Sequence, residues 1–271
     1  MPSNSHSPKY PVQTLEKALD IVEILSKVDG GEGLGVTELS KRLGIGKSTI
    51  HRILDTLAGY RYVEKTPANK YRLSWRLFEL GASVPHQRSL NNIDAADLQG
   101  LCDKHGETVN VGVRVGDGVV IISKVNPETA LRASLEVGTR EPIHPTALGK
   151  VLTSEMDEQQ VRALLGSEMQ AHTNQTITSP DAFIKELEKV REQGYAIDNE
   201  EFCFGLSCIS MPIRNYNGQI VAAISVTGPS FRMSFSKIME IKDDLREVTK
   251  KISAHLGHER ASGETAAARI E

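Results

Sequence analysis

The chain has 271 residues, of which 39% are hydrophobic and 25% charged, an ordinary composition for a globular protein. Its length fits one large or two ordinary domains. The three cysteines, the polar first eleven residues and the lack of a membrane-length apolar run argue against a secreted or membrane protein. They predict a cytoplasmic protein with reduced thiols.

Charge is distributed unevenly along the chain. Residues 1–80 hold 12 lysines and arginines against 9 acidic residues, whereas the remaining residues hold 20 against 26. A mildly basic N-terminal part on an acidic body is typical of a DNA-reading module joined to a domain that does not bind DNA. Because the excess is small, the prediction of DNA binding depends on the motifs.

The first predicted element after a disordered tail at residues 1–11 is a helix. Leu15, Leu19 and Val22 follow helical spacing and predict a helix over residues 13–27. The glycine-rich run at residues 29–33 ends this helix and forms a loop.

Residues 36–57 are predicted to form two short helices joined by a tight turn. Thr37 is expected to cap the first helix with its hydroxyl group, and Gly44 to end it by adopting a positive φ. The second helix has an apolar back and a polar front, a pattern that predicts reading of a DNA major groove. Its predicted DNA contacts are Lys47, Ser48, Thr49, His51 and Arg52.

A short hairpin is predicted next, with strands at residues 60–65 and 70–73 around a turn at 66–69. A helix, a helix pair and a hairpin, in this order, predict a winged helix-turn-helix that binds double-stranded DNA. The wing is expected to contact phosphates or a minor groove, with a plain two-stranded cap as the alternative. Its predicted contacts are Lys65, Asn69, Lys70 and Arg72.

An apolar helix is expected after the wing, capped by Ser74 and reaching about residue 88. It carries Trp75, Leu77 and Phe78 and has no obvious partner. It therefore predicts a linker helix that packs against another chain, with packing onto its own domain as the alternative. The predicted divisions are a tail at 1–11, a winged helix-turn-helix domain at 12–74, a linker helix at 75–91, a second domain at 92–257 and a flexible tail at 258–271.

The second domain is predicted to belong to the α+β class, with a mainly antiparallel sheet. Residues 108–115 alternate with a period of two and predict a half-buried strand. Further strands are predicted at residues 119–125, 131–137, 206–213 and 219–227, and helices at 93–105, 146–154, 157–165, 180–193 and 234–256.

Motifs along nearly the whole chain resemble those of IclR-type transcriptional regulators. The helix pair matches through residues 39–44 and 47–54. In the second domain the matching motifs are Thr146-Ala147-Leu148-Gly149-Lys150, then residues 191–209 with Gly194-Tyr195 and Asp198, and then residues 222–229.

The resemblance implies a GAF-like α/β effector-binding domain whose pocket takes a small organic acid. The residues implied at this pocket are Thr146, Ala147, Leu148, Asp198, Cys208, Ser225 and Thr227. Ser225 and Thr227 lie two apart on one strand, so they share a face, and both hydroxyl groups can donate to a carboxylate. Cross-sheet bonding by these hydroxyls, a turn capped by Asp198 and a core role for Cys208 remain the alternatives.

The resemblance also implies a biological role. Residues 176–179, 190–195 and 251–255 resemble regulators of sugar-acid breakdown that sense acids like 2-keto-3-deoxygluconate. The expected protein is a repressor of a catabolic operon that needs no cofactor and binds a pseudo-palindromic operator as a homodimer or homotetramer. The bulky Leu148 stands where some relatives carry a small residue, which narrows the pocket or makes it more apolar.

A metal- or thiol-dependent enzyme is the alternative function. His105, His144, His172, Cys203 and Cys208 are the available ligands in the second domain, but none of them forms an HxxxH or CxxC pair. Zinc held by His144 and its neighbours in place of an effector is a further alternative.

Overall fold

The structure is a computed structural model that describes residues 9–28, 32–87, 90, 93–133, 135–166 and 169–258. The chain divides into two compact units, unit 1 at residues 1–90 and unit 2 at residues 91–271. Of the two predicted tails, only residues 9–11 and His258 fall among the described residues.

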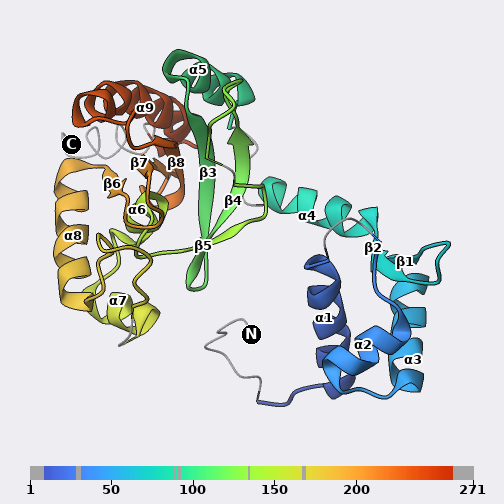
Figure 1. Ribbon diagram of the computed structural model, residues 1–271. Helices are drawn as coiled ribbons and strands as arrows, with labels where there is room; N and C mark the ends of the chain where they lie inside the picture. Colours follow the sequence, from blue (N-terminus) through green and yellow to red (C-terminus); the bar gives the residue numbers. More distant parts are fainter. Residues whose placement is uncertain are drawn as a thin grey trace, which may run out of the picture. The chain divides into compact units, whose positions relative to one another are not determined.

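Unit 1 has a three-helix body, a small hairpin and a final helix (Figure 1). Its elements are α1 (Gln13–Ser26), α2 (Val36–Leu43), α3 (Lys47–Gly59), β1 (Val63–Lys65), β2 (Tyr71–Leu73) and α4 (Trp75–Gln87). The core forms where the apolar stripes of the first three helices meet. Ile21, Leu39, Ile50 and Leu54 are all fully buried there.

The turn between α2 and α3 is defined by local contacts. Gly44 ends α2 with a φ of 67°, as predicted, and Ser40 Oγ donates to the Ile45 carbonyl at 2.6 Å. The predicted Thr37 cap is wrong, because α2 already begins at Val36. Leu34, two residues before that helix, exchanges two backbone hydrogen bonds with Tyr71 of the wing. This pairing fixes the chain at Leu34, and the helix begins at Val36, before the predicted cap.

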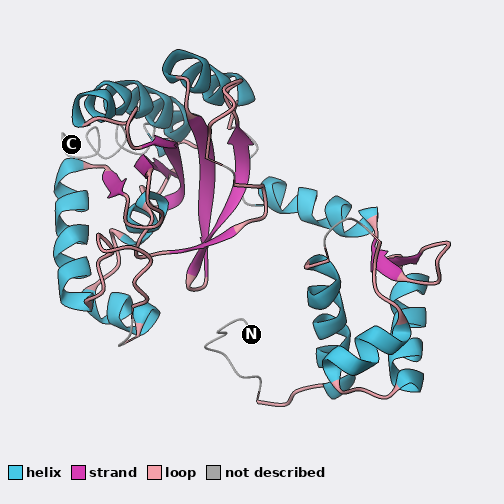
Figure 2. Ribbon diagram, viewed as in Figure 1, coloured by secondary structure: helices cyan, strands magenta, loops and turns pink. Residues whose placement is uncertain are grey.

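Unit 2 is built on a six-stranded antiparallel sheet with helices on both faces (Figure 2). Along the sheet the strands follow the order β5-β4-β3-β8-β7-β6. The strands are β3 (Thr108–Val115), β4 (Gly118–Val125), β5 (Arg140–Pro142), β6 (Ala196–Asn199), β7 (Leu206–Arg214) and β8 (Ile220–Pro229).

The helices of unit 2 are α5 (Ala95–His105), α6 (Ala147–Thr153), α7 (Glu158–Leu165), α8 (Pro180–Gln193) and α9 (Phe235–His255). Helices α5 and α9 cover one face of the sheet, while α6 lies on the other face with α8 packed behind it. The fold class predicted from the sequence is therefore confirmed.

Two details of unit 2 differ from the sequence prediction. The described residues of the segment 131–137 form a loop rather than a strand, because Ile121 of β4 bonds instead to Gly138 and Thr139, and the paired strand is β5. Strand β3 is not half-buried along its length. Its first five residues are all buried, since helices cover both faces of the sheet at this point.

Candidate functional site

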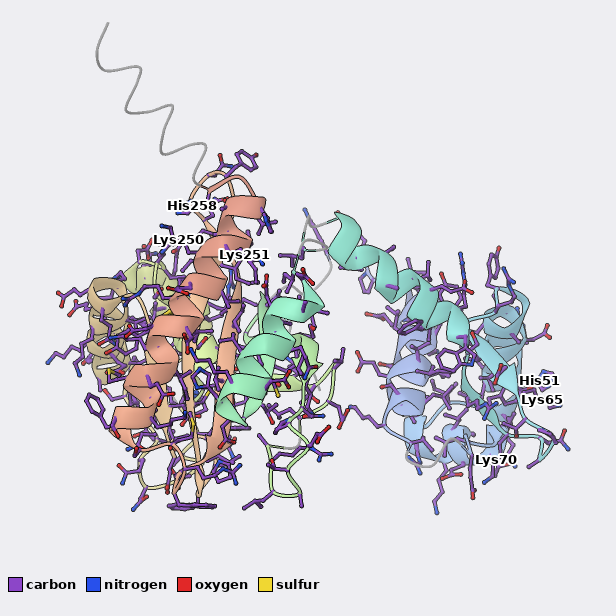
Figure 3. The ribbon with its side chains drawn as sticks, turned by 90° about the horizontal axis from the view of Figure 1, so that it is seen from above. His51, Lys65, Lys70, Lys250, Lys251 and His258 are labelled. Carbon is purple, nitrogen blue, oxygen red and sulfur yellow. The ribbon has the colours of Figure 1, made fainter. Side chains whose placement is uncertain are left out.

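The first candidate site is the polar face of α3. Ile50, Ile53 and Leu54 bury the back of this helix in the core of unit 1. The opposite face is exposed at Lys47, Ser48, His51 and Arg52, and half-buried at Thr49. Figure 3 shows His51 on this helix together with Lys65 and Lys70 of the wing. The predicted helix contacts thus form one solvent-facing surface with donors for base edges and phosphates.

One edge of this surface borders a groove. Thr49 and Arg52 lie beside Leu15 and Ala18 of α1, along a groove of about 580 Å³. Lys47, Ser48 and His51 do not line it. The predicted contacts therefore separate into Thr49 and Arg52, which line the groove beside α1, and Lys47, Ser48 and His51, which lie outside it.

The wing residues are exposed or partly exposed; two of them form ion pairs, and a third lies over an aromatic ring. Asn69 occupies the turn with a φ of 56°, and Lys65 Nζ lies 5.9 Å from the centre of the Tyr71 ring. Lys70 Nζ pairs with a Glu32 carboxylate oxygen at 2.8 Å, and Arg72 pairs with Glu64 at 2.7 Å. Such exposed ion pairs are weak, so a DNA phosphate can replace the glutamate as the partner of Lys70.

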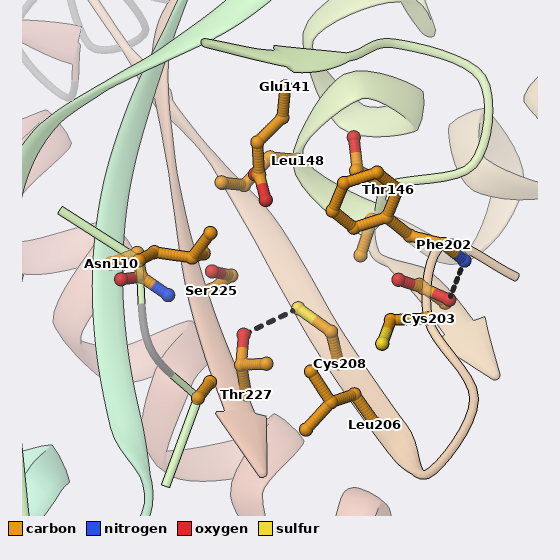
Figure 4. Close-up of a pocket in the computed structure, with 14 residues that line it drawn as sticks. Asn110, Glu141, Thr146, Leu148, Phe202, Cys203, Leu206, Cys208, Ser225 and Thr227 are labelled. Atoms are coloured by element: carbon orange, nitrogen blue, oxygen red, sulfur yellow. Dashed lines mark hydrogen bonds between the residues drawn. The ribbon is translucent and has the colours of Figure 1, made fainter. Parts of the chain in front are cut away.

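The second candidate site is a cavity of about 220 Å³ in unit 2, between α6 and the sheet (Figure 4). All seven residues that the resemblance implied lie along it, which places the predicted set around one space. The cavity is lined by Asn110, Ala133, Leu135, Glu141, Thr146, Ala147, Leu148, Asp198, Phe202, Cys203, Leu206, Cys208, Ser225 and Thr227.

Strand register brings the sheet residues of the cavity together. Asp198 of β6 stands opposite Cys208 of β7, which in turn stands opposite Thr227 of β8. Ser225, which lies two residues before Thr227 in β8, stands opposite Asn110 of β3. Because side chains two apart point to the same face, both rows project toward the cavity.

Helix α6 forms the other wall. The Thr146 hydroxyl group accepts a hydrogen bond from the Gly149 amide at 3.2 Å and donates to the Pro142 carbonyl at 2.8 Å, so it caps the helix. A Cβ atom on Gly149 would collide with the backbone carbonyl of Ile143. Glycine at this position therefore lets α6 approach the preceding loop closely.

Lys150, the last residue of the α6 motif, is fully buried. Its ammonium group donates to the Ile197 carbonyl at 2.9 Å and to Glu201 Oε1 at 2.5 Å, and lies 3.6 Å from Glu186. These bonds attach the end of β6 and the following loop to α6. Lys150 thus positions Asp198 and Phe202 at the cavity without lining it.

Two buried carboxyl groups face the cavity. Burial raises the pKa of Glu141 to about 7. Burial also raises the pKa of Asp198 to about 7, although Oδ1 of Asp198 accepts hydrogen bonds from the Glu201 and Phe202 amides at 2.7 and 3.4 Å. Asp198 therefore caps a turn as well as lining the cavity. Near neutral pH both groups can carry a proton and donate hydrogen bonds to a ligand.

The two cysteines of the cavity differ in environment. Cys208 is buried, which raises the pKa of its thiol to about 12, and the Thr227 hydroxyl group donates to its sulfur at 3.1 Å. Cys203 is exposed on the loop after β6. Cys208 is therefore a packing and hydrogen-bonding residue rather than a nucleophile.

Seven cavity residues were not predicted from the sequence: Asn110, Ala133, Leu135, Glu141, Phe202, Cys203 and Leu206. For Asn110 a signal exists in the alternation of Thr108, Asn110 and Gly112 with three valines, which marks a polar face of β3. The remaining residues lie in loops, in the three-residue strand β5 and at the start of β7, where no period marks them.

The lining of the cavity suits a small polar ligand. Lysine, arginine and histidine do not occur among its fourteen lining residues, so a ligand carboxylate would be bound by hydroxyl, amide and protonated carboxyl groups. The volume of about 220 Å³ lies below the range of about 300–1,000 Å³ of pockets for drug-sized ligands, so the space fits a molecule smaller than these.

The region around His144 was the proposed alternative metal site. His144 Nε2 lies 2.9 Å from the Gln170 carbonyl oxygen, and its ring centre lies 5.8 Å from that of His172. Within the described ranges, no three His, Cys, Asp or Glu side chains lie close enough to hold a metal ion. None of the helices in those ranges is long and apolar enough to cross a membrane.

A winged helix-turn-helix and a separate unit with a metabolite-sized cavity define the class of ligand-responsive DNA-binding proteins. The chain matches the family described as "Bacterial transcriptional regulator IclR C-terminal" over residues 83–254, and the "IclR helix-turn-helix domain" over residues 14–67. It belongs to the IclR family of transcriptional regulators, as the motifs predicted.

Individual relatives cover nearly the whole chain. The HTH-type transcriptional regulator KdgR of Escherichia coli K12 is 36% identical over 94% of this chain and 98% of its own length. The HTH-type transcriptional repressor AllR of the same strain is 30% identical over 90% of each chain. The crystal structure of the Thermotoga maritima IclR aligns with a TM-score of 0.74 and 30% identity, over 90% of this chain and 99% of that one.

Proposed function

We propose that this regulator is a repressor of a catabolic operon that releases its operator when a small organic acid, such as a sugar acid, fills the cavity of unit 2. The observation that carries the proposal is the grouping of the seven predicted effector residues around one metabolite-sized cavity. The resemblance of residues 176–179, 190–195 and 251–255 to regulators of sugar-acid breakdown supports a sugar acid as the ligand, and the chain is 36% identical to a KdgR regulator over 94% of its length.

The proposed division of labour follows the predicted boundaries. Residues 12–74 read DNA, residues 75–91 form the linker, and residues 92–257 bind the effector. The helix surface contributes Lys47, Ser48, Thr49, His51 and Arg52, and the wing contributes Lys65, Asn69, Lys70 and Arg72. Effector binding alters DNA affinity only because the two DNA-binding states differ in their affinity for the acid.

The proposed DNA-bound form is a homodimer or a pair of dimers. Leu15 and Leu19 of α1 are 57% and 56% exposed, and Trp75 and Phe78 of α4 are 78% and 68% exposed. Exposed apolar side chains at this density mark a protein interface. A dimer would read two half-sites about one helical turn, or a multiple of it, apart.

The test is a gel-shift titration at fixed salt with DNA from upstream of the gene itself and of its neighbouring genes. We expect retardation that sugar acids reverse. Arg52→Ala is expected to weaken DNA binding while leaving acid affinity, measured by calorimetry, within about twofold of wild type. Equal DNA affinity of wild type and Arg52→Ala would remove α3 from the DNA interface, and acid-insensitive retardation would refute the effector role.

A further inference from the structure

Asn110 has an unusual environment for a polar side chain. It lies in β3 with no exposed surface, and neither its Oδ1 nor its Nδ2 atom has a hydrogen-bond partner among the described residues. The hydroxyl group of Ser225, opposite it on β8, is also buried and makes no hydrogen bond of normal geometry in the described part of the chain, although it lies near enough to the Cys208 thiol to lower the pKa of that group. Figure 4 shows both side chains at the sheet wall of the cavity.

Three other polar side chains of the cavity already make hydrogen bonds within the protein. Thr227 donates to Cys208, Thr146 caps α6, and Asp198 accepts from two backbone amides. Among the residues that line the cavity, Asn110 and Ser225 are the two whose buried side-chain atoms lack a hydrogen-bond partner in the described part of the chain; Thr108 Oγ1 of β3 also lacks one, but Thr108 does not line the cavity. Buried polar groups without partners destabilise a fold, and they persist where a ligand supplies the missing bonds.

The atoms of Asn110 restrict the chemistry of the ligand group that would meet it. The amide presents an acceptor oxygen and an NH2 group that donates, whereas a carboxylate or ketone oxygen can only accept. Either of these would leave Oδ1 without a donor. A hydroxyl group satisfies both sides, because it donates to Oδ1 and accepts from Nδ2 or from the Ser225 hydroxyl.

We propose that Asn110 and Ser225 form a hydroxyl-binding subsite, so that the effector is an acid with a hydroxylated carbon chain rather than an aliphatic or aromatic acid. This inference rests on the proposed function, in which the cavity binds an organic acid. Glu141 reaches into the same cavity from β5 and lines it without a lysine or arginine partner. It offers a further hydrogen-bonding group to a ligand hydroxyl.

Matched ligands test this subsite by calorimetry on the full chain. 2-Keto-3-deoxygluconate and 2-oxohexanoate share the 2-oxo acid end and the six-carbon chain, but only the first carries hydroxyl groups on the rest of the chain. Gluconate and hexanoate form a second pair. We expect wild type to bind the hydroxylated member of at least one pair about tenfold or more tightly than the other member. When the analogue without hydroxyl groups is bound, the buried amide of Asn110 still has no partner.

Asn110→Leu is expected to abolish this preference by weakening only the hydroxylated acid. Without ligand, its Tm should rise by about 2–4 °C, because an unpaired buried amide is replaced by an apolar side chain of similar size. Asn110→Ala should lose the preference in the same way, and covers the case in which leucine does not fit. Leu206→Ala, at another part of the lining, is the matched control and should weaken both members of a pair equally.

The outcomes separate the two proposals. Wild type that binds an acid but does not distinguish the members of either pair overturns the hydroxyl subsite and leaves the acid-binding function in place. So does a preference that survives in both Asn110 variants. Wild type that binds none of the four acids overturns the proposed acid effector, and the subsite with it.

Discussion

Replacing Lys150 by methionine should show how much the buried ion pair between Lys150 and Glu201 contributes to the free energy of unfolding. The lysine ammonium group, with a side chain only 1% exposed, pairs with Glu201, whose side chain is 10% exposed. Methionine fills a similar volume and removes the charge. The Glu201 carboxyl group then stays buried without a cation, and the Ile197 carbonyl loses a donor.

The expected cost depends on pH. Burial raises the pKa of Glu201, and Lys150 opposes this rise, so the variant is expected to fold with Glu201 protonated. Protonating a carboxyl group of ordinary pKa 4.5 costs up to about 3.4 kcal/mol at pH 7 and about 0.7 kcal/mol at pH 5. The lost hydrogen bond adds about 1 kcal/mol. We therefore expect a loss of up to about 4.4 kcal/mol at pH 7 and of about 1.7 kcal/mol at pH 5.

Urea unfolding followed by circular dichroism at pH 5 and pH 7 measures this difference, with wild type at each pH as the reference. The double variant Lys150→Met/Glu201→Gln removes both charges of this pair, so its loss of stability relative to wild type should be small and should change little between pH 5 and pH 7. A Lys150→Met variant that loses the same free energy at both pH values would refute the buried ion pair as the origin of the effect.

Three further predictions concern the acids, a glycine and the wing. Because the pKa values of Glu141 and Asp198 rise from 4.5 and 3.8 to about 7, the folded protein binds more protons than the unfolded chain in this window, and stability falls as pH rises through it. Glu141→Gln should flatten the dependence of Tm on pH between 5 and 8. The affinity for the organic acid should fall above pH 7 in wild type, but less in this variant. A variant with the same pH dependence of Tm and of acid affinity as wild type would contradict the raised pKa of Glu141 and its contact with the ligand. Gly149→Ala should lose about 1–3 kcal/mol by collision with Ile143, while the control Gly100→Ala, where a Cβ meets open space in α5, should not destabilise; equal stability of the two variants in urea would show that α6 can shift. Lys70→Ala should weaken DNA binding and reduce its salt dependence by about one phosphate contact, whereas a lysine that serves only Glu32 would leave both unchanged.

Much of unit 1 could be predicted from the sequence because its signals are local. The spacing of Ile50, Ile53 and Leu54 determines which face of α3 is buried, and Gly44 supplies the positive φ that ends α2. The start of α2 could not be placed in the same way. It depends on the bridge between Leu34 and Tyr71, residues 37 positions apart in the chain.

The cavity also combines features that the sequence predicts with features that depend on contacts between distant parts of the chain. Family motifs named seven of its residues, and the register of four strands and the position of α6 bring those residues to one space. The alternation along β3 correctly separated Asn110 from the valines beside it, but alternation alone indicates a polar face that meets solvent. Only the tertiary structure decided that α6 covers this face. Once the face is buried, its polar side chains need hydrogen-bond partners other than water. A solvated asparagine needs no partner in the protein, whereas a buried one requires a ligand or a neighbour to satisfy its amide.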